Sequence, residues 1–322
     1  MRTDDVGTRG AGVSAGGRHA PIDRALGAAL NLLFPSDIYC AACGAYIDGT
    51  RPYALCDTCV REIAWHAGDT CAVCGKALAP RRSGGVCHDC RESGRAFDAG
   101  ASCCTYTGPA RDLVRAMKYK DSAWIAVKLA DVMYDRLRQL ARAEVERSDR
   151  VRCNRDRSVV PPSIFLLGPS VVIPVPMTEA KRRKRGYDQA EIIARRLAKL
   201  IDAPFGDGVL RRKRDTSVMS GLGLRERRAN MVDAFEVATD IRESASDGVA
   251  EERGLADGFG EPALVGDESE LSLFDVLLVD DVFTTGSTAD ACAAALKEAG
   301  AKRVTLFTFA AGADVDPRAA TE

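Results

Sequence analysis

The sequence predicts an α/β protein with a doubly wound, mainly parallel sheet, preceded by a small cysteine-rich module. Residues 274–283, FDVLLVDDVF, form an apolar run that ends in two acids, and segments typical of a helix and a strand follow it. This order is typical of a central strand in a parallel sheet. Residues 40–90 contain the same four-cysteine unit twice. We therefore expect a tail over residues 1–30, a cysteine-rich module over 31–100 and an α/β domain over 101–315.

The N-terminal segments differ sharply in composition. Residues 1–20 are rich in glycine and offer little to bury, which predicts a disordered tail. Residues 22–34 predict a short apolar helix that Pro35 ends. Apolar residues recur at helical spacing over 111–140, which predicts one or two amphipathic helices, and the polar stretch 141–160 is expected to be a loop.

From residue 164 onward, strand-like and helix-like segments alternate. The predicted strands are IFLL and VVIPVP between residues 164 and 176, the run 274–283, and VTLFTFA at 304–310; the predicted helices are YDQAEIIARRLAKLI at 187–201 and TADACAAALKEAG at 288–300. Gly300 is expected to end the last helix. A doubly wound sheet built from these segments would carry its ligand site at the carboxyl ends of the strands.

Charge is distributed unevenly along the chain. Its 45 basic and 46 acidic residues give a net charge of −1, which excludes a uniformly basic nucleic-acid binder. Residues 181–228 nevertheless carry a net charge of +9, and residues 240–275 a net charge of −9. The second segment lacks periodicity, so we expect an acidic, disordered insert at about 240–270.

The doubled cysteine unit predicts zinc binding. Each unit has the spacing C-x2-C-x12-C-x2-C, and zinc prefers four thiolates arranged as a tetrahedron. The predicted ligands are Cys40, Cys43, Cys56, Cys59, Cys71, Cys74, Cys87 and Cys90. Eight thiolates can close one or two structural Zn²⁺ sites, and the spacing leaves sequential and interleaved pairing open. The remaining cysteines, Cys103, Cys104, Cys153 and Cys292, are expected to be packing residues.

Cysteine usage and hydropathy also bear on location. The first twenty residues lack the apolar core of a secretory signal, so we expect a cytoplasmic protein whose paired cysteines bind metal instead of forming disulfides. No apolar run reaches the roughly 18 residues that a membrane-spanning helix needs, so no membrane insertion is expected. With three histidines in the chain, catalysis centred on histidine is not expected.

The segment LLVDDVFTTGST at 277–288 predicts a site for a phosphorylated sugar. A buried strand would deliver Asp280 and Asp281 to the edge of the sheet, where two carboxylates can accept hydrogen bonds from vicinal hydroxyls. The following turn exposes backbone N–H groups and hydroxyls at the start of a helix, which is an anion-binding arrangement. A plain helix cap would explain neither the paired acids nor the run of small hydroxyl residues.

LLVDDVFTTGST resembles the signature with which type I phosphoribosyltransferases bind 5-phosphoribosyl 1-pyrophosphate (PRPP). The whole chain resembles the ComF family of competence proteins, also called GntX-like, which join a zinc module to a phosphoribosyltransferase domain. The resemblance covers roughly residues 32–238 and 271–310. It implies a sheet of the type I phosphoribosyltransferase kind, PRPP as ligand and Mg²⁺ as the ion that accompanies it.

The resemblance also assigns roles to individual residues. By its motifs, Asp280 and Asp281 would hold the ribose hydroxyls and serve catalysis. The 5-phosphate would be held by Thr284, Thr285, Gly286, Ser287 and Thr288. The further PRPP contacts implied are Lys118, in the KY element at 117–120, and Arg185, Gly186 and Tyr187, in the RGYDQ loop. The mobile active-site loop implied is marked by Arg214, Thr216, Arg227 and Asn230. This chain has Asp188 and Met219 where the family has Asn and Gln.

The basic block 181–185 admits three interpretations: a solvated loop, a clamp for pyrophosphate, or a track for single-stranded nucleic acid. Tyr119 and Trp124 could cover a base or a sugar, although helical spacing favours a place in the core. As an enzyme, the protein would transfer ribose 5-phosphate from PRPP to a nitrogen nucleophile. As a binding module, which the resemblance links to natural transformation, it would handle single-stranded DNA with a helicase-like partner.

Overall fold

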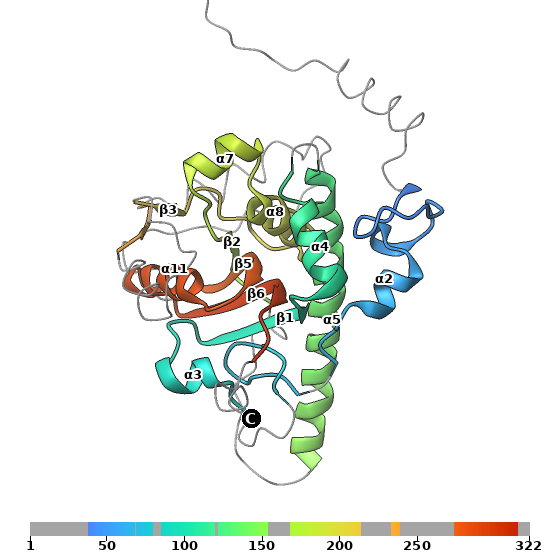
Figure 1. Cartoon of the computed structure of the whole chain (residues 1–322). Coiled ribbons are helices and arrows are strands. Elements are labelled where there is room, and N and C mark those ends of the chain that lie inside the picture. The colour runs from blue at the N-terminus through green and yellow to red at the C-terminus, as the bar shows by residue number, and fades with distance from the viewer. Residues whose placement is uncertain are drawn as a thin grey trace, which may run out of the picture.

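The computed structural model describes residues 38–67, 69–79, 85–119, 122–153, 168–213, 233–238 and 274–314. Within them, four parallel strands form one sheet in the order β1-β6-β5-β2 (Figure 1). These strands are β1 (Ala99–Thr105), β2 (Val171–Pro174), β5 (Asp275–Phe283) and β6 (Arg303–Ala311). Two short antiparallel strands, β3 (Leu210–Arg212) and β4 (Phe235–Val237), pair separately. The predicted parallel sheet is confirmed.

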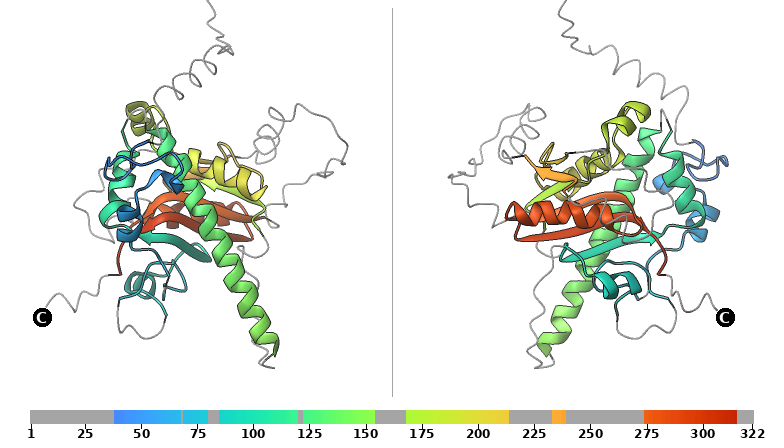
Figure 2. Two further views of the ribbon diagram at one scale, coloured as in Figure 1. Left: turned by 90° about the vertical axis from the view of Figure 1, so that its right-hand side faces the viewer. Right: turned by 60° about the vertical axis from the view of Figure 1, so that its left-hand side comes forward.

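Helices cover both faces of the sheet (Figure 2). In the described part of this domain the helices are α4 (Gly108–Ala116), α5 (Ala123–Cys153), α7 (Glu179–Arg185), α8 (Gln189–Ile201) and α11 (Ser287–Glu298). Successive residues of β5 pack on opposite faces: Val276 and Leu278 with α11, Leu277 and Val279 with α5 and α8. A strand buried on both sides needs a continuous apolar run, which explains the composition of 274–283.

The arrangement of β2 and β5 creates a topological switch point. The two strands are neighbours, yet α8, which follows β2, and α11, which follows β5, lie on opposite faces of the sheet. Ligands of doubly wound sheets bind in the crevice that forms at such a point. The last residue of β2, Pro174, pairs with Val279, so Asp280 and Asp281 lie just beyond the end of β2.

The cysteine-rich module consists of two ribbons that contact different parts of the domain (Figure 1). The first ribbon, residues 38–63, contains η2 (Pro52–Ala54) and α2 (Asp57–Glu62), which pack against α5 and α4 respectively. The second ribbon, described over 69–79 and 85–93, contains α3 (His88–Ser93). It lies so close to β1 that a Cβ on Gly75 would come within 2.5 Å of Ala101 Cα.

One local expectation is wrong, and one of three open interpretations is corrected. The stretch 141–160 is expected to be a loop, but α5 continues to Cys153, because residues 141–153 are rich in Arg, Ala and Glu and contain neither Gly nor Pro. Residues 141–146 are exposed or half-buried, in keeping with their polar composition. The basic block, for which a solvated loop was one of three interpretations, forms the short helix α7, which begins after the cap Thr178 and ends at Gly186.

Other expectations are confirmed or lie outside the described residues. The predicted helices at 187–201 and 288–300 correspond to α8 and α11, and the predicted strand at 304–310 lies within β6. The segments 1–30 and 240–270, the helix at 22–34 and the strand IFLL lie outside the described residues. In the described part of the chain, no helix combines the length and the apolar character that crossing a bilayer requires.

Candidate functional site

The eight predicted ligand cysteines form two separate four-sulfur groups with sequential pairing. One group consists of Cys40, Cys43, Cys56 and Cys59, and the other of Cys71, Cys74, Cys87 and Cys90. In each group the sulfur atoms all lie within 4.8 Å of one another. The interleaved pairing, which the spacing left open, does not occur.

The sulfur geometry fits tetrahedral zinc. With Zn–S bonds of about 2.3 Å, a tetrahedron has sulfur–sulfur edges of about 3.8 Å. The Sγ atoms of Cys43 and Cys56 are 3.8 Å apart, and those of Cys74 and Cys87 are 3.6 Å apart. None of these eight cysteines is in a disulfide. Four thiolates in each ribbon leave no open coordination position, so the sites are structural.

The two zinc sites differ in exposure. In the first ribbon Cys43 is exposed and Cys56 half-buried, whereas all four cysteines of the second ribbon are buried. Burial of Cys40 favours the neutral thiol, but the backbone N–H groups of Cys56, Cys43 and Ala42 outweigh it and lower the pKa of Cys40 to about 7. Thiolates are the form that binds zinc, so Cys40 is the ligand of this site most readily ionised, whereas the pKa values of Cys43 and Cys59 are raised.

The acidic pair lies at the carboxyl edge of the sheet, as predicted. Asp280 and Asp281 are half-buried at the end of β5, and the backbone N–H of Asp281 donates to Oδ1 of Asp280 over 2.8 Å. Burial of the Asp280 carboxyl, followed by the charge of Asp281, raises its pKa well above the ordinary value. Two carboxylates held this closely repel each other, and a donor or cation placed between them relieves the repulsion.

The turn after β5 presents small hydroxyl residues at the start of α11. Thr284 is exposed, Thr285 and Thr288 are half-buried, and Ser287 is buried. The hydroxyl oxygens of Thr285 and Ser287 lie 3.3 Å apart. Gly286 has a φ of +84°, and a Cβ there would come within 2.5 Å of Arg95 Nη1. Glycine is therefore required both by the backbone conformation and by the space.

The structure brings the KY element and the RGYDQ loop together. The hydroxyl of Tyr187 donates to the carbonyl oxygen of Met117 and, over 2.8 Å, to that of Tyr119. Lys118 and Arg185, both half-buried, thus belong to segments that contact each other. The position expected for Tyr119 in the core is wrong, because its side chain is 71% exposed; Trp124 is half-buried.

Basic side chains from three segments gather around Lys181, within reach of the charge of Asp281. Partial burial of Lys181, followed by the charges of Arg212, Arg185 and Lys118, lowers its pKa, whereas the charge of Asp281 acts in the opposite direction. These groups come from α7, from β3 and from the turn after α4. The repulsion that Lys181 feels from three other bases indicates an excess of positive potential, which favours a bound anion.

Asp188, which replaces the family's Asn, has a structural role. It caps α8: its Oδ1 accepts from the N–H groups of Ala190 and Glu191 over 2.9 and 3.3 Å, and its Oδ2 accepts from Met177 over 3.1 Å. Burial, opposed by these hydrogen bonds, raises its pKa. Asp188 therefore fixes the segment between β2 and α8, which borders the switch point.

Some predicted site residues lie outside the described residues, namely Arg214, Thr216, Met219, Arg227 and Asn230. In the sequence, Lys181 and Arg212 stand out only as bases of the positively charged segment 181–228. Arg95 has no local signal, because it is a lone arginine after the last ligand cysteine. A cavity of about 470 Å³ beside α11 is lined by Arg95 and Ser287, among others, but by neither residue of the acidic pair.

Comparisons with known proteins identify the cysteine-rich module and find relatives that match most of the chain. The family model of the double zinc ribbon domain matches residues 29–91. The chain is 24% identical over 256 residues to competence protein F of Haemophilus influenzae, and the match covers 80% of this chain and 90% of that protein. It is 22% identical over 255 residues to DNA utilization protein YhgH of Salmonella typhimurium, which covers 79% of this chain and 89% of that protein.

Proposed function

Because the chain belongs to the ComF family of competence proteins, we propose that it acts in DNA uptake and binds PRPP at the switch point of its sheet. One observation carries the choice of PRPP. An acidic pair and a turn of small hydroxyl residues lie together at the carboxyl edge, next to basic side chains from α7, β3 and the turn after α4. A ribose with a phosphate at one end and a pyrophosphate at the other matches this division of charge.

The acidic pair suits the ribose diol. A carboxylate only accepts hydrogen bonds, and two vicinal hydroxyls can each donate one. Asp280 and Asp281 lie beyond the end of β2, where a sugar can approach them without displacing a strand. Donation by the hydroxyls would also relieve the repulsion that raises the pKa of Asp280.

The turn suits the 5-phosphate. The first N–H groups of a helix have no partner within the helix, and they carry partial positive charge. The helix that follows Gly286, α11, is 12 residues long, so this effect is well developed. The hydroxyls of Thr284, Thr285, Ser287 and Thr288 add donors around the same turn.

The basic side chains suit the pyrophosphate. Lys118, Lys181, Arg185 and Arg212 would neutralise charge that grows on the departing group when the bond to ribose breaks. Mg²⁺, a hard ion that favours carboxylate and phosphate oxygens, would help to carry the same charge, and Asp280 and Asp281 offer it suitable oxygens.

If the protein turns PRPP over, the reaction is transfer of ribose 5-phosphate to a nitrogen nucleophile with loss of pyrophosphate. The anomeric carbon loses its bond to the pyrophosphate oxygen, and the nitrogen lone pair forms the new bond. The residues at the switch point would orient the sugar and stabilise the charge, without a covalent intermediate. Tyr119, which is exposed and next to Lys118, would be available to stack on an acceptor base.

Isothermal titration of the full chain with PRPP and Mg²⁺ tests the proposal. We expect heat of binding for the wild type and at least a tenfold weaker affinity for the double variant Asp280→Asn with Asp281→Asn, about 1.4 kcal/mol. Asp207→Asn is the control, because it removes an exposed carboxylate away from the switch point. Asp207 lies two residues after Phe205, which pairs with Val172 of β2. Absence of heat for the wild type, or unchanged affinity in the double variant, would refute PRPP binding.

A second candidate function, binding of single-stranded DNA, is favoured by α7. Its last turn carries Arg182, Arg183, Lys184 and Arg185, and none of its residues is buried. A short basic helix of this kind can follow a phosphate backbone. DNA bound there would lie beside the switch point, and a helicase-like competence protein is the partner that the family resemblance implies.

A gel-shift titration at several salt concentrations tests DNA binding. Arg183→Glu with Lys184→Glu should weaken binding and flatten the dependence on salt, because fewer counterions are released. The matched control reverses two exposed charges on α5, Arg138→Glu with Arg142→Glu. Equal effects of the two double variants would argue against α7 as the binding surface.

A further inference from the structure

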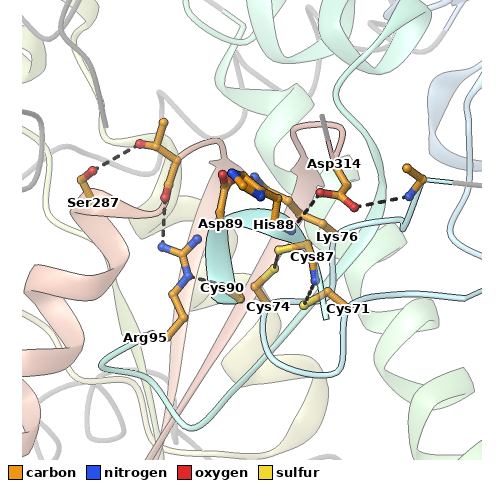
Figure 3. A network of polar contacts seen from close by, with 12 residues as sticks. Cys71, Cys74, Lys76, Cys87, His88, Asp89, Cys90, Arg95, Ser287 and Asp314 are labelled. Carbon is orange, nitrogen blue, oxygen red and sulfur yellow. Dashed lines mark hydrogen bonds and ion pairs between the residues drawn. The ribbon is translucent and has the colours of Figure 1, made fainter. Parts of the chain in front are cut away.

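One side chain of the second ribbon's C-terminal flank holds the turn after β5 (Figure 3). Arg95 is fully enclosed, with a side-chain exposure of 0%. Its Nε donates to Sγ of Cys90 over 3.2 Å, and its Nη1 donates to the carbonyl oxygen of Thr285 over 2.9 Å and to Oδ2 of Asp290 over 2.8 Å. A single guanidinium therefore joins a zinc ligand to the anion-binding turn and to α11.

The same ribbon also encloses the residue that begins the turn. The guanidinium carbon of Arg95 and Nζ of Lys76 each lie 5.3 Å from the centre of the Phe283 ring. Lys76 is 3% exposed and pairs with Asp89 of α3 over 2.7 Å. Arg95 fills the space that a side chain at position 286 would occupy. The ribbon thus supplies the surface against which Phe283, Thr285 and Gly286 take their conformation.

The position of Arg95 against the turn depends on zinc, because Arg95 is hydrogen-bonded to a zinc ligand. The metal keeps Cys90 as a thiolate in a fixed position, and a charged sulfur is a stronger acceptor for a guanidinium than a thiol. Within the described part of the chain, Nη2 of Arg95 is buried without a hydrogen-bond partner. The buried charge therefore depends on Cys90, Thr285 and Asp290, and loss of one partner leaves it poorly compensated.

The first ribbon has no comparable contact with the turn among the described residues. Its η2 and α2 pack on α5 and α4, and its nearest polar link to the domain runs from the hydroxyl of Tyr53 to the carboxylate of Asp135. Its cysteines belong to the hydrophobic cluster of α5, whereas those of the second ribbon share a cluster with Phe283 and α11. The two zinc ions are therefore not equivalent with respect to the switch point.

We propose that zinc in the second ribbon, acting through the positioning residue Arg95, holds the β5–α11 turn in the conformation that binds a phosphorylated ligand. Loss of this zinc would release the turn and weaken ligand binding, and loss of the first ribbon's zinc would do neither. The identity of the ligand rests on the proposed function; the coupling between zinc and turn does not.

The first experiment compares Arg95→Lys with the wild type by hydrogen–deuterium exchange, PRPP titration and zinc content. Lysine keeps the charge but cannot reach Cys90 and Thr285 together. We expect both zinc ions to be retained, exchange to be faster in peptides covering 283–290, and PRPP affinity to fall about tenfold or more, as for residues that orient a metal site. The matched control is Arg51→Lys in the first ribbon, an arginine paired with Asp57. Unchanged exchange at 283–290, or an equal change in Arg51→Lys, would overturn the proposal.

The second experiment uses the wild type and does not depend on how a variant folds. Zinc is removed stepwise with a chelator, and thiol alkylation reports which ribbon has lost its metal. Exchange at 283–290 should rise together with alkylation of Cys71, Cys74, Cys87 and Cys90, before the peptides of β6 open. A turn that stays protected until the whole sheet unfolds would refute the coupling. Because exchange needs no ligand, a failure of the wild type to bind PRPP refutes the proposed function alone.

Discussion

His66 joins the cysteine-rich module to β1 as a neutral residue. It is 5% exposed, and its Nδ1 and Nε2 lie 3.1 Å from the hydroxyl oxygens of Ser102 and Thr105. The Ser102 hydroxyl donates to the carbonyl oxygen of Gly75 over 3.0 Å, so Nδ1 carries the proton and donates to Ser102. Burial, followed by the charge of Arg136, lowers the pKa of His66 to about 4.

This pKa predicts a loss of stability in mild acid. His66 becomes protonated below about pH 6.5 in the unfolded chain but only below about pH 4 in the folded chain. Between these two pH values, proton binding therefore favours the unfolded chain. The free energy of unfolding should therefore fall by about 2 kcal/mol between pH 7.5 and pH 5 through this residue. Urea unfolding of the zinc-loaded protein, compared with His66→Gln, measures it. Equal pH dependence in both proteins would contradict the prediction.

Gly286 combines a positive φ with a close neighbour, so Gly286→Ala should be costly. Alanine strains the backbone and also places a Cβ against Arg95 Nη1 and Phe283 Cε2, at 2.5 and 2.6 Å. We expect a loss of about 2–4 kcal/mol in unfolding free energy. Gly186→Ala is the control for stability, because its φ is +86° and nothing lies within 4 Å of the added Cβ; it should lose only about 1 kcal/mol. Similar losses in urea unfolding would show that the contact with Arg95 is unimportant.

At the scale of elements, the cap of α8 depends on one side chain. Asp188→Ala removes acceptors for three backbone N–H groups and should lower the unfolding free energy by about 1–2 kcal/mol. Asp188→Asn keeps one acceptor oxygen and should lose clearly less. Thermal and urea unfolding measure both variants. If asparagine is as harmful as alanine, the contribution of Asp188 is its charge and not the cap.

The elements themselves were largely predictable because their signals are local. The period of 3.6 residues identified α8 and α11, and the apolar run of 274–283 identified β5, which is buried on both faces. The spacing of the cysteines gave the zinc ligands but not their pairing, because both pairings use the same knuckles. The helical form of the basic block was not predicted, because its charged residues show no apolar period and only the cap Thr178 and Gly186 mark its ends.

At the scale of the whole molecule, the unequal exposure of the zinc sites predicts the order of metal loss. Cys43 is exposed, whereas all four cysteines of the second ribbon are buried. A chelator should therefore remove the first zinc quickly and the second slowly, and only the second step should lower the melting temperature of the sheet domain strongly. Native mass spectrometry during chelation, with a parallel thermal scan, checks the order. Simultaneous loss of both ions would contradict it.

The contacts that could not be predicted are those that join distant parts of the chain. Arg95 and Thr285 are 190 residues apart, and Tyr187 reaches Met117 across 70 residues. The strand order places β1, which follows the second ribbon in the sequence, next to β6. No local pattern in the sequence reveals such neighbours. The acidic pair was recognisable from its own motif, but Arg95, which contacts the turn after it, was not.

The strand order has one more consequence, for the chain as it leaves the ribosome. β6 lies between β1 and β5, although it is the last of the described strands to be synthesised, and Asp314, just after it, accepts hydrogen bonds from the N–H groups of Ala79 and His88 in the second ribbon. A nascent polypeptide interrupted before residue 303 would lack the partner of β1 and these contacts. Its exposed apolar strands would mark it for chaperones and proteases, so only completed translation products would escape degradation.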